Sequence, residues 1–179
     1  ATTMSFSVVI LAAGMGTRMK SKLPKMLHEA AGRPLTEHVI RAVLPLKPTK
    51  IIVVIGHGAE QVKARFSHYD VEFVLQEKQL GTGHALMQTE AALKNLQGDV
   101  MVLNGDGPLL RTETLGQLVN AQKDRDGMTL ITCNVSNPTG LGRILRDAKG
   151  DIANIIEEKD TTPEQKKITE INPGIYMFD

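Results

Sequence analysis

Near its start the chain reads Ser7-Val-Val-Ile-Leu-Ala-Ala-Gly-Met-Gly-Thr-Arg18. The first five residues form a short, β-branched apolar run, which predicts a buried strand, and the glycines predict a turn directly after it. Further apolar runs at 51–55, 71–75 and 100–103 alternate with segments of helical spacing. Strands that are apolar throughout are typical of parallel sheets covered by helices on both faces. The sequence therefore predicts an α/β, Rossmann-like, doubly wound fold with a mostly parallel sheet.

The segments between these runs have the apolar spacing of helices. Thr36 is of a residue type that often precedes the first helical turn, so we expect it to be an N-cap. Further helices are predicted over 60–66, over 82–93 and around 115–119. Helices in these places supply the cover that a buried parallel sheet requires.

After residue 139 the pattern of apolar and polar residues changes. Apolar runs at 143–145 and 152–156 flank Asp147-Ala-Lys-Gly150, which predicts a hairpin. The polar segment 161–167 is expected to be a loop or short helix, and 171–178 reads as one further strand. Cys133, the only cysteine, follows an apolar stretch and is expected to be buried on a strand. A single cysteine excludes a disulfide framework and cysteine-based metal sites.

Composition narrows the class of function. The chain has 179 residues, 3% aromatic residues and a formal net charge of +1. Few aromatic rings leave little on which single-stranded bases could stack, and so small a charge attracts neither DNA nor an acidic membrane. No apolar stretch near the start is long enough to span a bilayer, and no signal peptide precedes it. We therefore expect a cytoplasmic protein that binds neither nucleic acid nor membrane.

The glycine turn after the first predicted strand is the first candidate site. Glycines let successive backbone N–H groups converge on an anion, and four cations follow within eight residues: Arg18, Lys20, Lys22 and Lys25. This combination suits a triphosphate or pyrophosphate. Met19 stands where a dinucleotide-binding fingerprint needs its third glycine, and also where a P-loop needs the glycine before its lysine. Neither a dehydrogenase nor a P-loop NTPase is supported.

Three other places could hold ligands. Asp106 follows the strand at 100–103 between glycines, so it could bind Mg²⁺ or simply initiate a turn. Gln76 lies in a polar segment that leads to Gly81 and His84, and its amide could contact the edge of a base. His84 itself is expected to be structural or exposed at the start of a helix. Polar residues between 138 and 172 could collect sugar hydroxyls, or could be ordinary solvated side chains.

Several motifs together resemble one enzyme family. In order along the chain they are Leu11-Ala-Ala-Gly-x-Gly-Thr-Arg-Met19 with Pro24-Lys25, Gln79-Leu-Gly-Thr-Gly-His-Ala85, Gly105-Asp-x-Pro-Leu109, Asn137-Pro-Thr-Gly-x-Gly-Arg-Ile144, Glu157-x-Lys-Asp160 and Glu170-Ile-Asn172. The set resembles the N-terminal domain of the bacterial bifunctional N-acetylglucosamine-1-phosphate uridylyltransferases/glucosamine-1-phosphate acetyltransferases. The resemblance covers nearly the whole chain.

The resemblance implies a reaction: uridylyl transfer from UTP to N-acetylglucosamine-1-phosphate, which yields the cell-wall precursor UDP-N-acetylglucosamine and pyrophosphate. It implies the nucleotide-diphospho-sugar transferase type of fold and catalytic roles for Arg18, at the departing pyrophosphate, and Lys25, at the α-phosphate. Asp106 would bind Mg²⁺. The implied substrate-binding residues are Leu11, Ala12, Ala13, Gly14, Gly16 and Thr17 for the nucleotide phosphates, Gln76, Gly81 and Thr82 for uracil, and Gly142, Glu157 and Asn172 for N-acetylglucosamine.

The resemblance also sets expectations for the chain as a whole. It implies one nucleotidyltransferase domain over 1–179, with a nucleotide-binding part at 1–135 and the start of a sugar-binding part at 136–179. Family members continue beyond this point and end in a β-helix acetyltransferase domain, so we expect a truncated chain with no acetyltransferase activity and weak or no uridylyl transfer. Full-length members are expected to be homo-oligomeric.

Some residues depart from the family pattern, and some alternatives stay open. Asn104, Gly107 and Pro173 replace other residues at their motif positions, and Pro173 removes a backbone donor near the expected sugar. These changes are expected to affect sugar affinity and to leave the reaction class unchanged. A cytidylyltransferase or a GTP-dependent molybdopterin enzyme has a similar glycine loop. An inactive module that only binds nucleotide is a further alternative.

Overall fold

The computed structural model describes residues 4–13, 27, 29–78, 80–105, 110–123 and 125–179. The chain divides into two compact units. The first contains residues 1–129 and 176–179, and the second contains residues 130–175.

The first unit is built on a six-stranded sheet with the order β5-β4-β1-β6-β12-β7. The strands are β1 (Phe6–Ala12), β4 (Lys50–Ile55), β5 (Glu72–Leu75), β6 (Asp99–Asn104), β7 (Met128–Leu130) and β12 (Tyr176–Phe178). The pairs β1–β4, β4–β5 and β1–β6 are parallel, and β12 is antiparallel to β6. The predicted α/β fold with a mostly parallel sheet is therefore confirmed.

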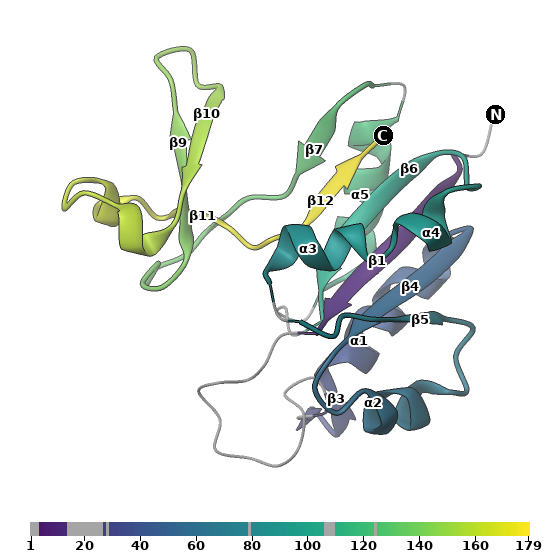
Figure 1. The fold of residues 1–179 in the computed structure, drawn as a ribbon. Coiled ribbons are helices and arrows are strands. Elements are labelled where there is room, and N and C mark those ends of the chain that lie inside the picture. Colours follow the sequence, from purple (N-terminus) through teal and green to yellow (C-terminus); the bar gives the residue numbers. More distant parts are fainter. Residues whose placement is uncertain (1–3, 14–26, 28, 79, 106–109, 124) are drawn as a thin grey trace. The chain divides into compact units, whose positions relative to one another are not determined.

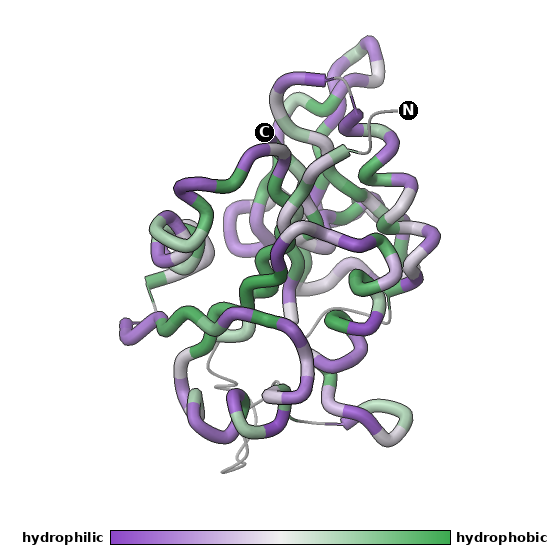
Figure 2. The backbone as a smooth tube through the Cα atoms, turned by 90° about the vertical axis from the view of Figure 1, so that its right-hand side faces the viewer, coloured by the Kyte–Doolittle hydropathy of each residue, from purple (hydrophilic) through white to green (hydrophobic). Residues whose placement is uncertain are grey.

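Helices cover both faces of this sheet (Figure 1). They are α1 (Leu35–Val43), α2 (Ala59–Phe66), α3 (Thr82–Met87), α4 (Glu90–Leu93) and α5 (Thr112–Gln122), with the short 3₁₀ helix η2 (Leu44–Leu46) after α1. Val9, Val54 and Val102 pack with Ala85 of α3 on one face. On the other side, the Thr112 hydroxyl of α5 donates to the Ala42 carbonyl of α1. In Figure 2 the hydrophobic colouring follows the central strands.

A small hairpin precedes the first helix. It consists of β2 (Glu29–Ala30) and β3 (Arg33–Pro34). Helix α1 then begins at Leu35, after Pro34, whose backbone is extended. Thr36 therefore lies inside the first turn, and the prediction that it caps the helix is wrong. Its side chain is fully buried and its hydroxyl donates to the Gly105 carbonyl at 3.1 Å, because that buried acceptor needs a partner.

The helix predicted over 82–93 is two helices. α3 ends at Met87 and α4 starts at Glu90, with Thr89 between them. The Thr89 hydroxyl donates to the Leu86 carbonyl at 2.6 Å, and its backbone N–H donates to the same carbonyl at 2.9 Å. Threonine often competes in this way with regular helical hydrogen bonding. Of the two short helices, α3 buries Ala85, whereas α4 has no fully buried residue.

The second unit is a four-stranded antiparallel sheet with the order β10-β9-β11-β8. Its elements are β8 (Cys133–Asn134), β9 (Gly142–Arg146), β10 (Ile152–Ile156), β11 (Glu170–Asn172) and the 3₁₀ helices η3 (Glu158–Asp160) and η4 (Gln165–Lys167). The predicted hairpin is confirmed as β9–β10. Its turn is closed by the Asp147 carboxylate, which accepts from the backbone N–H groups of Lys149 and Asp151.

Two predictions for this region are wrong. The strand predicted over 171–178 is two strands in different sheets, β11 and β12, because the chain turns at Pro173 and Gly174. Gly174 has a φ of 79°, and its N–H donates to the Asn172 side chain at 3.0 Å. Cys133 is exposed, although it lies on a strand. β8 is an edge strand of the small sheet and pairs with β11 alone.

Within the part of the chain that the structure describes, no helix is long and apolar enough to cross a membrane.

Candidate functional site

The carboxyl edge of the parallel sheet carries the first group of candidate residues. Leu11 and Ala12 end β1, Ala13 follows directly, and both alanines are buried. The Leu11 carbonyl accepts a hydrogen bond from the N–H of Gly105, 2.9 Å away, at the end of β6. Ligands in doubly wound sheets bind beyond this edge. The structure therefore places the last residues before the predicted glycine loop and before Asp106 side by side.

Gly105 is tightly enclosed at this edge. A Cβ atom on it would lie 3.0 Å from the Thr36 hydroxyl, 3.2 Å from the Ala12 Cβ and 3.2 Å from the Leu11 carbonyl oxygen. Only glycine fits here without displacing a neighbour. Packing thus explains why position 105, before Asp106, is a glycine: without a side chain there, the end of β6 can lie against the end of β1.

The remaining candidates of this group fall outside the described residues. They are Gly14, Gly16, Thr17, Arg18, Lys25 and Asp106. Among the residues that are described, no group of three or more histidine, cysteine, aspartate or glutamate side chains could hold a metal ion.

Gln76, Gly81 and Thr82 lie next to each other in the first unit. Gln76 follows β5, where its backbone N–H donates to the Ile55 carbonyl at 2.8 Å, and its side chain is buried. The Gln76 amide nitrogen lies 3.3 Å from the Gly81 carbonyl oxygen and 2.9 Å from His84 Nδ1. Gly81 has a φ of 97° and immediately precedes α3, which begins at Thr82. These contacts hold the side chain of Gln76 in one orientation.

His84 takes part in this network in a way that the sequence did not indicate. Its second ring nitrogen lies 3.3 Å from the amide nitrogen of Gln88, one helical turn further on. The neighbouring residue Ala85 packs with Ala13 in the same buried cluster. α3 is thus anchored to β1 by packing and to the end of β5 by the Gln76–His84 contact.

The second unit brings Gly142, Glu157 and Asn172 together. Gly142 is the first residue of β9 and pairs in register with Asn172, at the end of β11. Ile156, the last residue of β10, pairs with Arg143, so Glu157 emerges beside Gly142. A Cβ on Gly142 would lie 3.6 Å from one Glu157 carboxylate oxygen and 3.7 Å from the other. Any side chain at position 142 would therefore contact this carboxylate.

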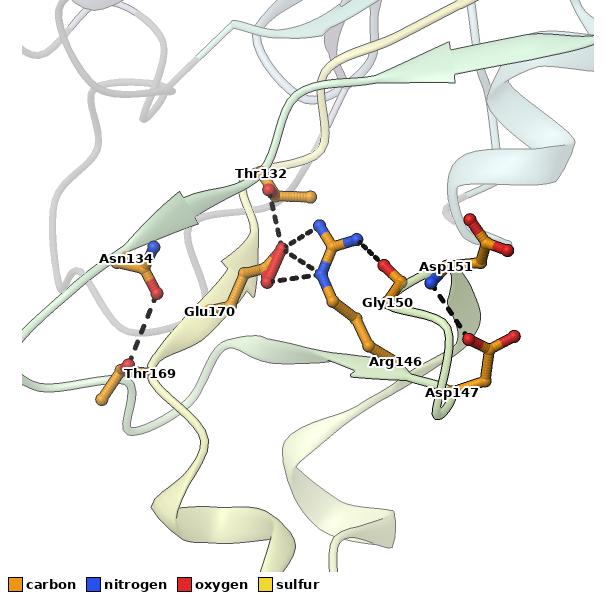
Figure 3. A network of polar contacts seen from close by, with 8 residues as sticks. All are labelled: Thr132, Asn134, Arg146, Asp147, Gly150, Asp151, Thr169 and Glu170. Atoms are coloured by element: carbon orange, nitrogen blue, oxygen red, sulfur yellow. Dashed lines mark hydrogen bonds and ion pairs between the residues drawn. The ribbon is translucent and has the colours of Figure 1, made fainter.

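An ion pair stabilises the same small sheet (Figure 3). The Arg146 guanidinium contacts the Glu170 carboxylate, with Nη2 2.6 Å from Oε1, and also donates to the Gly150 carbonyl at 2.7 Å. The Thr132 hydroxyl donates to the same carboxylate at 3.0 Å. Hydrogen bonds from Arg146 hold the pKa of Glu170 below its usual value, and those bonds raise the pKa of Arg146. Arg146 thereby fastens the β9–β10 turn to β11.

Comparison with known proteins decides the family. A family model described as the MobA-like NTP transferase domain matches residues 8–155, more than four fifths of the chain. The chain belongs to the MobA-like NTP transferase domain family. Its predicted enzyme class, nucleotidyltransferase, agrees with this family.

Relatives of this NTP transferase domain have closely similar sequences. The chain is 51% identical to the bifunctional protein GlmU of Paraburkholderia phymatum over 96% of its own length. It is 52% identical to GlmU of Nitrosococcus oceani over 98% of its length. In both cases the match spans 38% of the relative. These matches confirm the resemblance that the motifs indicate.

Similarity to solved structures supports the fold of the NTP transferase domain. A protein of Bacillus anthracis described as a glucose-1-phosphate thymidylyltransferase superposes with a TM-score of 0.78. It covers 98% of this chain and 72% of its own chain, at 22% sequence identity. At that identity the similarity concerns the fold alone.

Proposed function

We propose that this chain transfers a uridylyl group from UTP to N-acetylglucosamine-1-phosphate, giving UDP-N-acetylglucosamine and pyrophosphate. The observation that carries the proposal is the identity of about one half with GlmU proteins across 96–98% of the chain. The motifs that imply this reaction lie within the matched length.

The proposed reaction is an in-line displacement at phosphorus. A phosphate oxygen of the sugar phosphate forms a bond to the α-phosphorus of UTP, the bond to the bridging oxygen breaks, and pyrophosphate leaves with the electron pair. Such chemistry depends on positioning and on stabilisation of negative charge more than on a dedicated base. Lys25 would stabilise charge at the α-phosphate and Arg18 would stabilise the leaving pyrophosphate. Gly14, Gly16 and Thr17 would hold the phosphates through their backbone N–H groups.

The packing at the carboxyl edge supports this location for the nucleotide. Leu11, Ala12 and Ala13 lead the chain to the glycine loop, and Gly105 leads it to Asp106 from a neighbouring strand. Asp106 would bind the divalent ion, and we propose Mg²⁺ because magnesium prefers carboxylate and phosphate oxygens. Bound there, the ion would neutralise phosphate charge.

The Gln76 network supports uracil recognition. A buried amide that Gly81 and His84 hold in one orientation presents a defined hydrogen-bonding edge. Gly81 and Thr82 would let the backbone approach the ring closely, since Gly81 carries no side chain.

The geometry of the second unit supports sugar recognition. A carboxylate accepts hydrogen bonds only, so Glu157 suits sugar hydroxyls or an N-acetyl N–H. Asn172 adds a group that both donates and accepts, on the strand adjacent to Gly142. We propose that residues 1–135 serve the nucleotide and 136–179 serve the sugar, which stays a prediction, as do the cytoplasmic location and the oligomeric state.

Comparison of nucleotides tests the proposal. Release of pyrophosphate should be measured with UTP, CTP and GTP, each with N-acetylglucosamine-1-phosphate and Mg²⁺. We expect UTP to support release and to bind more tightly than the other two. A preference for CTP or GTP would place the chain with the cytidylyltransferases or molybdopterin enzymes and refute the uracil assignment. Tight binding of UTP with no release would favour the binding-module alternative.

A further inference from the structure

One buried arginine beside the proposed sugar group has no role in the function described so far. Arg143 follows Gly142 on β9 and is only 1% exposed. Burial of a guanidinium is costly unless the charge is paired and hydrogen-bonded. Its contacts therefore show which parts of the second unit the buried charge holds together.

The guanidinium of Arg143 joins three segments of the chain. Its Nη1 lies 2.6 Å from Oε2 of Glu158 on η3 and also donates to the Leu141 carbonyl, in the loop before β9. Its Nη2 donates to the Lys166 carbonyl on η4 at 3.2 Å. The Glu158 contact is an ion pair by distance without the alignment of a hydrogen bond, and Nε has no hydrogen-bond partner among the described residues. The pair is thus electrostatic, and the two carbonyls provide the directional bonds.

The position of Glu158 links this pair to the proposed site. Ile156 is the last residue of β10 that pairs with β9. Glu157 follows it, so strand pairing does not hold Glu157 in place. Glu158, the next residue, is fixed to Arg143, and Arg143 is bonded in sequence to Gly142. Glu157 is itself exposed, whereas the Glu158 side chain is 30% exposed. The pair thereby links Gly142, through Arg143, to Glu157, through Glu158.

We propose that Arg143 and Glu158 are a positioning pair that holds the Glu157 carboxylate beside Gly142 and so sets the affinity for the sugar phosphate. This inference rests on the proposed function. The pair acts through Glu157 and contacts no substrate itself. A sub-ångström or ångström change in the position of a binding group is enough to weaken substrate binding strongly.

Glu158→Gln tests the pair with the smallest change in shape. The variant keeps an oxygen that can accept a hydrogen bond, and it removes the charge that fixes Arg143. We expect the KM for N-acetylglucosamine-1-phosphate to rise about tenfold. The KM for UTP and kcat should change by less than about twofold, because the nucleotide group lies in the other unit. A purely structural role would lower the apparent kcat through loss of folded protein and leave the KM for both substrates unchanged in the protein that stays folded.

Glu164→Gln is the matched control. Glu164 forms an exposed ion pair with Lys167 in the same unit, with Nζ 3.0 Å from Oε1, so the control makes the same chemical change away from Arg143. Exposed pairs of this kind contribute little, so the KM for the sugar phosphate should stay within about twofold of the parent. An equal KM in both variants and the parent would overturn the inference.

A second variant tests the pair in case Glu158→Gln does not fold. Glu158→Gln leaves a buried guanidinium without a counter-charge, which can unfold a small unit. Arg143→Met combined with Glu158→Leu removes both charges, and we expect the same rise in KM for the sugar phosphate. A folded double variant with the parental KM would contradict the proposal.

A measurement without substrate separates this inference from the proposed function. Removal of the nearby carboxylate in Glu157→Gln should move the backbone amide signal of Gly142 in NMR spectra. We expect this movement to be smaller when Glu157→Gln is made in the Glu158→Gln background, and to persist in the Glu164→Gln background. If the parent chain neither binds nor turns over the sugar phosphate, the proposed function fails while this comparison of spectra still tests the pair. An equal movement in the Glu158→Gln background would overturn the inference.

Discussion

Gly105 is the residue at which packing leaves the least freedom near the proposed nucleotide site. A Cβ atom there would press on Thr36, Ala12 and Leu11 at 3.0–3.2 Å. We expect Gly105→Ala to destabilise the chain by about 1–3 kcal/mol, measured as a lower midpoint of denaturant unfolding. Gly116→Ala is the control, since its Cβ would meet only Leu46, at 3.6 Å, inside helix α5. There alanine should stabilise by roughly 0.5–1 kcal/mol, and equal effects of both variants would contradict the packing argument.

Glu170 gives the small sheet a dependence on pH. Arg146 lowers the pKa of the Glu170 carboxyl from its usual 4.5, so the folded state binds the proton more weakly than the unfolded state. The stabilising contribution is therefore present above pH 4.5 and is lost as pH falls through the lowered pKa. Thermal unfolding of the parent and of Glu170→Gln should differ most near pH 7 and converge in acid. A difference independent of pH would show that the charge of Glu170 contributes nothing.

Lys25 is the residue on which the proposed chemistry depends most. Its charge would act mainly as negative charge develops at the α-phosphate, so Lys25→Ala should lower kcat by roughly 10²–10³ with little change in UTP affinity. Steady-state kinetics and a UTP titration measure the two effects separately. Lys167→Ala, which removes an exposed lysine, should leave kcat unchanged. Loss of UTP affinity without loss of kcat would make Lys25 a binding residue only.

At the scale of elements, the contact between the end of β5 and α3 makes a prediction of its own. His84 on α3 holds the amide of Gln76 at 2.9 Å, so His84→Ala should loosen the proposed uracil contact. We expect the KM for UTP to rise by about three- to tenfold, which corresponds to one lost hydrogen bond. The KM for the sugar phosphate should not change. His68→Ala, at an exposed histidine, is the control. Equal effects of the two variants on the KM for UTP would show that His84 does not position Gln76 for uracil.

The elements also show where sequence periodicity is informative. The strands β1, β4 and β6 are each within one residue of their predicted bounds, because continuous apolar runs between turn residues leave few alternatives. The breaks at Thr89 and at Pro173-Gly174 were missed. Both depend on tertiary context: Thr89 is buried, and the turn at Gly174 moves the chain from one sheet to another. Apolar periodicity continues across such points and does not reveal them.

At the scale of the whole molecule, the family and the fold could be predicted, and the contacts within the site only in part. The Gly142, Glu157 and Asn172 motifs are far apart in sequence, and the register of β9, β10 and β11 brings them together. The burial of Arg143 and its pairing with Glu158 could not be predicted, since a Gly-Arg step and an acidic run look like solvated surface. Thr36 was misassigned for a similar reason: its partner is 69 residues away.

The chain spans 38% of the length of the GlmU relatives that it matches, so the activity of the chain itself is the central question. The most direct measurement is pyrophosphate release from UTP and N-acetylglucosamine-1-phosphate by this chain, with Mg²⁺ and with EDTA. We predict slow release, because the chain spans only part of its relatives, and this release should require both substrates and the metal ion and stop on chelation. Release that EDTA leaves unchanged would contradict the proposed metal role of Asp106. No release, with no binding of UTP in a titration, would contradict the proposed function itself.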